Sequence, residues 1–361
     1  MFALVKFTDA CNMACSYCCM GHSKPATTMP LEQAQQTIKT IVSYLKKIDD
    51  KEKDICFHGG EPSLLGADYL ANLYDIIRTA DNKITISIQS NLLNIPDDLI
   101  KVFAEYDVRV STSIDGPISI HDKFRKDKVG NGTFSRVMAN VNNCQAKGLE
   151  VGLICTLNQS NCRIPEELYY FFKGIGLPYK INWVHKIGGG TDSVVNIDNS
   201  QLSTCIIQLL TTFLSDESPS IVDDTSIEFM IGTMSGKMVS CSMKGACQKE
   251  FICVEANGDV YPCDAFSYLP NAKKYCFGNI ITDGEAVFNA TNRQELAKRG
   301  PKTITECYKC KYQHLCHGGC LLDSQMENII GSKNSFCEAY HTIFDFCAEF
   351  QKQHKLHSFN N

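Results

Sequence analysis

The stretch CNMACSYC spans Cys11–Cys18 and directly follows the apolar run Phe2–Phe7. Its three cysteines are separated by three and then two residues. A four-iron cluster is normally held by four cysteine thiolates. A cluster held by three would keep one iron open, as a catalytic zinc keeps one position open. The stretch therefore indicates an open iron–sulfur site, with part of a zinc site or a group of buried thiols as the alternatives.

Length and composition narrow the class of protein. The chain has 361 residues, 44% of them hydrophobic, which is enough for one large domain and a smaller one. A net charge of −5 argues against a nucleic-acid or membrane partner. No apolar run has the length of a membrane span and no secretory signal is apparent, so we expect a cytoplasmic protein. In that reducing compartment, 20 cysteines predict metal or redox chemistry rather than disulfides.

Short β-branched runs alternate with longer amphipathic stretches in the first half of the chain. The expected strands are Ala3–Phe7, Asp54–Phe57, Ile84–Ser90, Val108–Ser113, Val151–Thr156 and Lys180–Val184. The expected helices between them are Leu31–Leu45, Tyr69–Thr79, Phe134–Ala146 and Pro165–Phe172. Six βα units predict an α/β fold in which a parallel sheet curves into a partial (β/α)6 barrel. Ligands of such sheets bind at the carboxyl ends of the strands.

The second half has a different character. Ile187–Ser200 is rich in Gly, Asp, Ser and Asn and is expected to be a long loop before a helix at Gln201–Leu214. Cysteines then recur with little helical periodicity until a last helix at Phe336–Gln353. We expect four parts: a partial barrel at 1–200, a helical bridge at 201–240, a small Cys-rich domain at 241–340, and a C-terminal helix and tail at 341–361.

Two further segments come after expected strands. The turn HGGEP, His58–Pro62, follows the second strand, and its glycines would let the backbone approach a ligand while Glu61 receives an ammonium group. A plain turn explains the same residues. Ser113 ends the fourth strand before a Pro/Gly turn, and Arg125 lies just beyond it. Because these segments come after parallel strands, we expect them at the same edge of the sheet as the cysteines.

The C-terminal third carries the most specific pattern. Eight cysteines recur there: Cys241, Cys247, Cys263, Cys307, Cys310, Cys316, Cys320 and Cys337. Eight soft thiolates suit two iron–sulfur clusters, with zinc sites as the alternative. The nine other cysteines are expected to be mostly buried small hydrophobic side chains, Cys19 beside the first motif included.

These motifs together resemble the radical S-adenosylmethionine (SAM) superfamily. The resemblance implies that Cys11, Cys15 and Cys18 hold a [4Fe–4S] cluster whose open iron chelates SAM. The turn comprising His58, Gly59, Gly60 and Glu61 would then hold the methionyl amino group, and Ser113 would contact SAM. Arg125 would pair with the SAM carboxylate or, as we favour, with a surface acid. Gln89 and Asn91 match a family Gln-Thr-Asn pattern, with backbone hydrogen bonding at a strand end as their plainer role.

The C-terminal cysteines resemble the SPASM arrangement found in maturases of peptides and anaerobic sulfatases. That resemblance implies two auxiliary [4Fe–4S] clusters and so three clusters in all. The first would be held by Cys241, Cys247, Cys263 and Cys320, and the second by Cys307, Cys310, Cys316 and Cys337.

Asp264, directly after Cys263, matches the aspartate that serves sulfatase maturases as the base for the substrate cysteine or serine. A turn carboxylate is the plainer interpretation. His58 stands where some of those enzymes carry glutamine, which weakens the transfer of their substrate-binding residues.

The resemblance covers essentially the whole chain and implies an enzyme that modifies a peptide or protein side chain. Only ten residues precede Cys11, so we expect no N-terminal peptide-recognition domain. We favour a cross-link or related change in a ribosomally made peptide, with sulfatase maturation, the oxidation of Cys or Ser to formylglycine, as the alternative. An electron donor such as flavodoxin or ferredoxin is the expected partner. A non-catalytic iron–sulfur electron carrier is the distant alternative, because an open three-cysteine site would have no use in a carrier.

Overall fold

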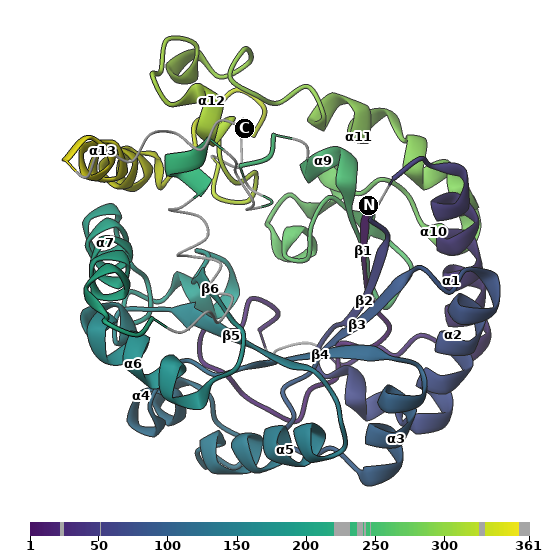
Figure 1. The fold of residues 1–361 in the computed structure, drawn as a ribbon. Helices are drawn as coiled ribbons and strands as arrows, with labels where there is room; N and C mark the ends of the chain where they lie inside the picture. The colour runs from purple at the N-terminus through teal and green to yellow at the C-terminus, as the bar shows by residue number, and fades with distance from the viewer. Residues whose placement is uncertain are drawn as a thin grey trace.

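The computed structural model describes residues 1–21, 25–50, 52–219, 232–236, 241, 243–245, 247–324 and 329–353. Its centre is a curved sheet with six parallel strands in the order β6-β5-β4-β3-β2-β1 (Figure 1). The strands are β1 Phe2–Lys6, β2 Asp54–His58, β3 Thr85–Gln89, β4 Val108–Ser113, β5 Val151–Leu157 and β6 Tyr179–Trp183. Every strand expected from the sequence is present, with ends that differ by at most one residue. The predicted parallel α/β barrel is confirmed.

Helices cover the outer side of the sheet (Figure 1). They are α1 Leu31–Lys47, α2 Ala67–Ala80, α3 Asp97–Glu105, α4 Ile118–Phe124, α5 Phe134–Ala146, α6 Pro165–Ile175 and α7 Asn199–Ser215. Helices α3 and α4, with 9 and 7 residues, were not predicted from the sequence. Helices of two turns carry too few residues for a helical period to stand out.

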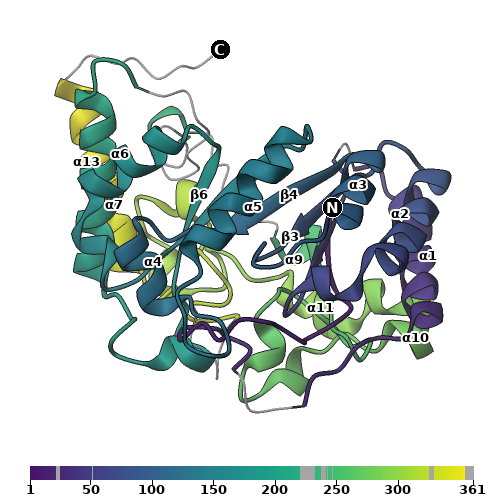
Figure 2. The ribbon, with the colours of Figure 1, turned by 90° about the horizontal axis from the view of Figure 1, so that it is seen from below.

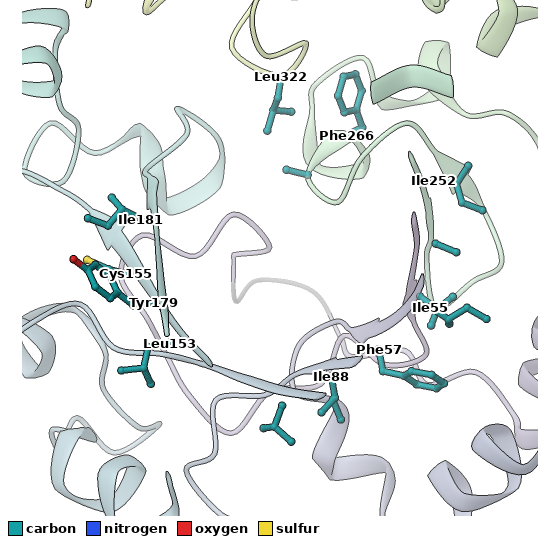
Figure 3. Packing of buried hydrophobic residues seen from close by; sticks show 14 of the residues in the cluster. Ile55, Phe57, Ile88, Leu153, Cys155, Tyr179, Ile181, Ile252, Phe266 and Leu322 are labelled. Atoms are coloured by element: carbon teal, nitrogen blue, oxygen red, sulfur yellow. The ribbon is translucent and has the colours of Figure 1, made fainter. Parts of the chain in front are cut away.

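The strands bury one face and leave the other facing the barrel interior. In β3, for example, Ile86 and Ile88 are fully buried whereas Thr85, Ser87 and Gln89 are only partly so. Successive side chains of a strand point to opposite faces, so this alternation packs isoleucine against the helices and turns Gln89 inward. Figure 3 shows Ile55, Phe57, Ile88 and Leu153 of this buried layer. The polar positions on the inner face are therefore available to form a site.

The Cys-rich region continues the same sheet. Strand β7 (Phe251–Val254) pairs in parallel with β1, and β8 (Val260–Tyr261) pairs antiparallel with β7. Phe2 and Phe251 lie opposite each other and their rings stack at 4.9 Å. Strands of four and two residues are too short for a periodic signal. Residues of the expected second domain thus extend the barrel next to its first strand.

Short elements make up most of the rest: α9 Cys247–Glu250, α10 Ile280–Asp283, α11 Thr291–Leu296 and α12 Gln313–Cys316. The final helix α13 (Cys337–Gln353) confirms the predicted one and packs beside α7 (Figure 1). Most of the expected bridge beyond α7, and the tail at 354–361, lie outside the described residues. Within the described residues, no helix combines the length and apolarity needed to cross a membrane.

Candidate active site

A cavity of about 660 Å³ opens at the carboxyl ends of the barrel strands. The cavity wall includes every site residue predicted in the barrel, and Asp264 from the Cys-rich region. The ten predicted residues that line it are Cys11, Cys15, Cys18, His58, Gly59, Gly60, Glu61, Ser113, Arg125 and Asp264. The sheet edge therefore collects side chains from positions 11 to 264 in one space.

The three cysteines of the first motif are partly buried. Burial raises the pKa of Cys11 to about 11 and that of Cys15 to about 12. A thiol with such a pKa becomes a thiolate only when it gains a positive partner such as a metal. Three soft sulfur ligands on one loop, facing a cavity, fit an iron–sulfur cluster with an open iron. No group of three or more Cys, His, Asp or Glu side chains among the described residues is arranged to hold a single metal ion.

The Gly59-Gly60 turn after β2 packs directly on the chain that leads into the cysteine loop. A Cβ on Gly59 would lie 2.2 Å from the carbonyl oxygen of Thr8, and one on Gly60 would lie 2.2 Å from that of Ala10. The Gly60 amide donates to the Thr8 carbonyl at 2.9 Å. The glycines are thus needed for the approach of two backbone segments, in addition to any approach to a ligand.

A second glycine run braces the far end of the cysteine loop. Gly188 and Gly189 belong to the short 3-10 helix η3 (Gly188–Thr191) after β6. The Gly189 amide donates to the Cys18 carbonyl at 3.0 Å, and a Cβ on Gly188 would lie 2.3 Å from the Cys19 carbonyl oxygen. From the sequence, this run was expected only to be part of a long loop. Three consecutive glycines after a strand were the signal that such a close approach was needed.

The segment after α4 supports the middle of the same loop. The amides of Ala14 and Ser16 donate to the carbonyls of Lys126 and Phe124, at 2.8 and 3.0 Å. Figure 2 shows the chain after β1 passing beside the loops that come after α4, at one end of the barrel. Three separate βα connections therefore hold the cysteine loop through its backbone.

Arg125 corrects one prediction. Its guanidinium pairs with Asp115 at 2.8 Å, and the Asp115 side chain is 0% exposed. The favoured expectation of a surface acid is therefore wrong: the acid is buried. The Tyr17 hydroxyl also donates to Asp115, and the Arg125 guanidinium lies over the Tyr17 ring at 5.1 Å. Arg125 still reaches the cavity wall, so it joins the cysteine loop, through Tyr17, to the end of β4.

Glu61 is 1% exposed and uses both carboxylate oxygens within the chain. One oxygen accepts from the Ser63 amide at 3.0 Å and the Ser90 hydroxyl at 2.7 Å, and the other from the Asn91 amide at 2.6 Å. Burial raises the Glu61 pKa, although these bonds oppose the rise. Its carboxylate thus fastens the ends of β2 and β3 together while facing the cavity.

Polar side chains link β3 to β4 and to the cysteine loop. Gln89 accepts from the Ser111 hydroxyl at 2.6 Å and donates to the Ser113 hydroxyl at 3.4 Å. The Asn91 side-chain amide donates to the Asn12 side-chain oxygen at 2.8 Å. Gln89 and Asn91 therefore do more than cap strand ends, because they orient Ser113 and Asn12.

Asp264 meets several positive or protic groups in the cavity. Burial by itself would raise its pKa, but the nearby Lys6 ammonium holds the pKa of Asp264 below the ordinary value. The Cys263 thiol donates to its carboxylate at 3.1 Å. Burial lowers the pKa of His58, whose Nδ1 accepts from the Gly59 amide at 2.7 Å, so the neutral ring carries its proton on Nε2. Asp264 is thus an ionised carboxylate inside the cavity.

Lys6 was not singled out from the sequence. Its side chain is 3% exposed, donates to Glu255 at 2.9 Å, and also donates to the backbone carbonyl of Asp264. The ammonium lies over the Tyr268 ring at 4.7 Å. A lysine inside the apolar strand run Phe2–Phe7 was the available signal, because such a residue is rarely buried without a partner. Lys6 connects the first barrel strand to the loop that carries Asp264.

Several of the auxiliary cysteines influence one another electrostatically within each of the two predicted sets, although the assignment of the sets stays a prediction. Charge on Cys320 and Cys241 raises the pKa of Cys263, and charge on Cys241 raises the pKa of Cys247. The second set is linked in the same way, because Cys337, Cys307 and Cys310 each raise the pKa of Cys316. Burial is the largest cause for all of these thiols.

The unassigned cysteines are mostly buried, as predicted. Seven of the nine lie in the interior: Cys56, Cys144, Cys155, Cys162, Cys205, Cys253 and Cys347. Cys19 and Cys276 are partly exposed. Cys19 also lines the cavity, next to the cysteine loop.

Comparison with known families agrees with this arrangement. Residues 5–165 match the family model of the radical SAM superfamily. Residues 235–311 match the model described as an iron-sulfur cluster-binding domain, SPASM. The two matched segments contain the barrel cysteine loop and most of the auxiliary cysteines.

Several curated relatives match nearly the whole chain. A cysteine-type anaerobic sulfatase-maturating enzyme of Clostridium perfringens is 27% identical over 359 residues, covering 94% of each chain. A serine-type enzyme of Bacteroides thetaiotaomicron is 26% identical and covers 97% of this chain and 90% of its own.

Solved structures share the fold. Native anSMEcpe with bound AdoMet superposes with a TM-score of 0.83 at 24% identity, covering 98% of both chains. Streptococcus suis SuiB bound to the precursor peptide SuiA superposes with a TM-score of 0.68 at 14% identity, covering 93% of this chain and 75% of that one.

Proposed function

Because this chain belongs to the radical SAM superfamily and carries a SPASM iron–sulfur domain, we propose that it oxidises a protein cysteine or serine to formylglycine. The sequence alone favoured peptide cross-linking. The match to a sulfatase-maturating enzyme, which covers 94% of both chains, supports sulfatase maturation over peptide cross-linking. The observation that carries the proposal is the position of Asp264, which lines the same cavity as the three-cysteine loop.

[4Fe–4S] clusters and SAM are the cofactors of this enzyme class. We assign the first cluster to Cys11, Cys15 and Cys18, and the auxiliary clusters to the two sets of four cysteines described above. When bound, the first cluster and SAM supply the one-electron chemistry that removes a hydrogen atom from a substrate carbon. An external donor such as flavodoxin or ferredoxin would supply the electron.

The chain's own residues have separate tasks. The Asp264 carboxylate takes the proton from the substrate thiol or hydroxyl, and Lys6 holds the Asp264 backbone in place. Ser113, positioned by Gln89, and the turn of Gly59 and Gly60 are the groups available to SAM.

The test is Asp264→Asn, which keeps the shape of the side chain and removes its basicity. We expect the variant to retain its clusters and its release of 5′-deoxyadenosine but to lose ~10²–10⁴-fold in product, the usual contribution of a positioned base. Asp49→Asn, at an exposed carboxylate far along the chain, is the matched control. Product is measured by mass spectrometry on a peptide with the modified cysteine.

The mass change also identifies the reaction. Formylglycine replaces the cysteine sulfur by oxygen, whereas an intramolecular cross-link loses only two hydrogens. A cross-linked product would favour peptide maturation. His58 also supports that alternative, because it stands where some sulfatase maturases carry glutamine. Wild-type yield from the Asn variant would remove Asp264 as the base.

A further inference from the structure

A second acid–base pair lies on the cavity wall. His185 follows β6 and lines the cavity, and its Nδ1 lies 2.7 Å from a carboxylate oxygen of Asp323. Asp323 comes from the Cys-rich region, three residues after Cys320, and its side chain is 5% exposed. Its second oxygen is buried without a hydrogen-bond partner in the described part of the chain. This carboxylate is therefore directed at one partner, the imidazole.

The geometry determines which ring nitrogen is free. A carboxylate accepts, so Nδ1–H of His185 donates to Asp323 and Nε2 is left for the cavity, where 34% of the side chain is exposed. Burial lowers the His185 pKa, but Asp323 and, more weakly, Asp264 outweigh it and raise the pKa overall. A base oriented by a third group is the usual arrangement for proton transfer in active sites.

His121 shows what a structural histidine looks like in the same fold. It is 0% exposed, its Nδ1 accepts from the Asp115 amide at 3.4 Å, and its Nε2 lies 3.0 Å from the Thr133 hydroxyl. Both of its nitrogens are thus used within the barrel, and it does not line the cavity. His185 keeps one nitrogen for a molecule in the cavity.

The proposed reaction needs a base that can activate a water molecule in the cavity. Oxidation of a cysteine side chain would remove a hydrogen atom from Cβ, the thiol proton, for which Asp264 is the acceptor, and one electron, for which a bound auxiliary cluster would be the acceptor. The product is a carbon–sulfur double bond. Formylglycine has oxygen at that carbon, so water must replace sulfur. A serine side chain would reach the aldehyde directly.

We propose that His185, held by Asp323, catalyses this hydrolysis; the inference rests on the proposed function. His185 Nε2 takes a proton from water while the water oxygen bonds to the carbon and the electrons of the carbon–sulfur double bond move to sulfur. The proton is then returned to sulfur. The second water proton takes the same route as the carbon–sulfur bond breaks, the carbonyl forms and hydrogen sulfide leaves. The step is redox-neutral and consumes only water.

The test separates oxidation from hydrolysis in a single turnover on a cysteine peptide. His185→Gln should release 5′-deoxyadenosine at the wild-type rate but accumulate a species that has lost two hydrogens and kept its sulfur. We expect the conversion of this species to formylglycine to slow ~10²-fold, the lower end of the contribution of a general base. Asp323→Asn should slow the same step less, because the ring keeps its position but loses its charged partner. Lys186→Gln, at the exposed neighbouring residue, is the control.

Two results would overturn the assignment. Formylglycine formed by His185→Gln without delay would show that the imidazole is not needed. Oxidation and hydrolysis slowed to the same extent would show a structural role only. Failure of the proposed function looks different, because wild-type enzyme itself would then yield no formylglycine.

Discussion

The two cysteine-bearing regions of this molecule are held in different ways. The barrel loop Cys11–Cys18 is fixed by backbone contacts from three neighbouring connections, and none of those contacts involves a thiol. The Cys-rich region has short regular elements, and the buried Arg299 side chain joins several of its loops. Its guanidinium donates to Ile329, Gly319, Gly318 and Ser332 carbonyls and to the Ser324 hydroxyl.

Arg299 also lies between the two auxiliary sets. Burial lowers its pKa, while charge on Cys320 and Cys247 of the first set and Cys307 and Cys316 of the second raises it. From this difference in support we infer that the barrel holds its cysteine loop in position before any cluster is bound. The Cys-rich region instead depends on Arg299 and, we expect, on its clusters, because metal binding supplies folding free energy where secondary structure is sparse.

The largest expected effect comes from removing ligands. Replacing Cys11, Cys15 and Cys18 together by alanine should abolish 5′-deoxyadenosine release. The iron content should also fall by one third, from a total on the order of twelve irons at four per cluster. The fold should persist, because the contacts that hold this loop are backbone bonds. Iron analysis and circular dichroism measure both.

The corresponding variant of the Cys-rich region combines Cys263→Ala with Cys320→Ala. It should disorder the Cys-rich region, seen as new protease cleavage sites after residue 241. If both variants unfold, or both stay folded, the contrast between the regions does not hold. A preparation that fills with zinc would contradict the cluster assignment itself.

Gly60→Ala tests the close packing of the barrel loop. The new Cβ would lie 2.2 Å from the Ala10 carbonyl oxygen and 2.5 Å from that of Asp9, and backbone atoms cannot move aside cheaply. We expect a loss of about 3 kcal/mol of unfolding free energy, the upper end for overpacking, and of SAM cleavage. Gly174→Ala, in helix α6 with open space around it, is the control and should be neutral or slightly stabilising. Denaturant titration reads both, and equal stability of the two variants would contradict the packing argument.

Arg299→Lys tests how the buried guanidinium organises the loops of the Cys-rich region. Lysine keeps the charge but loses the planar fork, so at least one charge-assisted bond is lost, at about 2–3 kcal/mol. The loss should appear as reduced protection of residues 318–324 and 329–332 in hydrogen exchange, with barrel strands unaffected. Arg163→Lys, at an exposed guanidinium, is the control. Uniform loss of protection throughout the chain would show that the two regions unfold as one unit.

Lowering the pH should destabilise the barrel through protonation of His121. Burial lowers its pKa to about 4, below the usual value near 6.5. The unfolded chain therefore binds more protons than the folded one between these values, so stability from this group is present above pH 6.5 and is lost as the pH falls toward 4. We expect a contribution of about 2 kcal/mol to this loss at pH 5. His121→Asn should flatten that part of the stability profile relative to His314→Asn, at an exposed ring. Identical profiles would contradict the shift.

The sequence by itself determined the barrel and the membership of its site. The alternation of β-branched strands with amphipathic helices is local, and so are the spacings of Cys11, Cys15 and Cys18 and of the turn at His58–Glu61. Parallel strands bring the segments at their carboxyl ends to one edge of the sheet, so residues far apart in sequence were expected together. Ten predicted residues do line one cavity.

Tertiary structure alone decided how those residues are held and charged. Arg125 was expected at a surface acid and is paired with buried Asp115, because only packing determines which carboxylate loses water. The roles of Lys6, Gly188 and His185 likewise arise from contacts with residues over 100 positions away or with another loop's backbone. Such contacts leave no periodic trace in the sequence. Hydrogen bonding and desolvation depend on neighbours in space, whereas strands, turns and ligand spacings depend on neighbours along the chain.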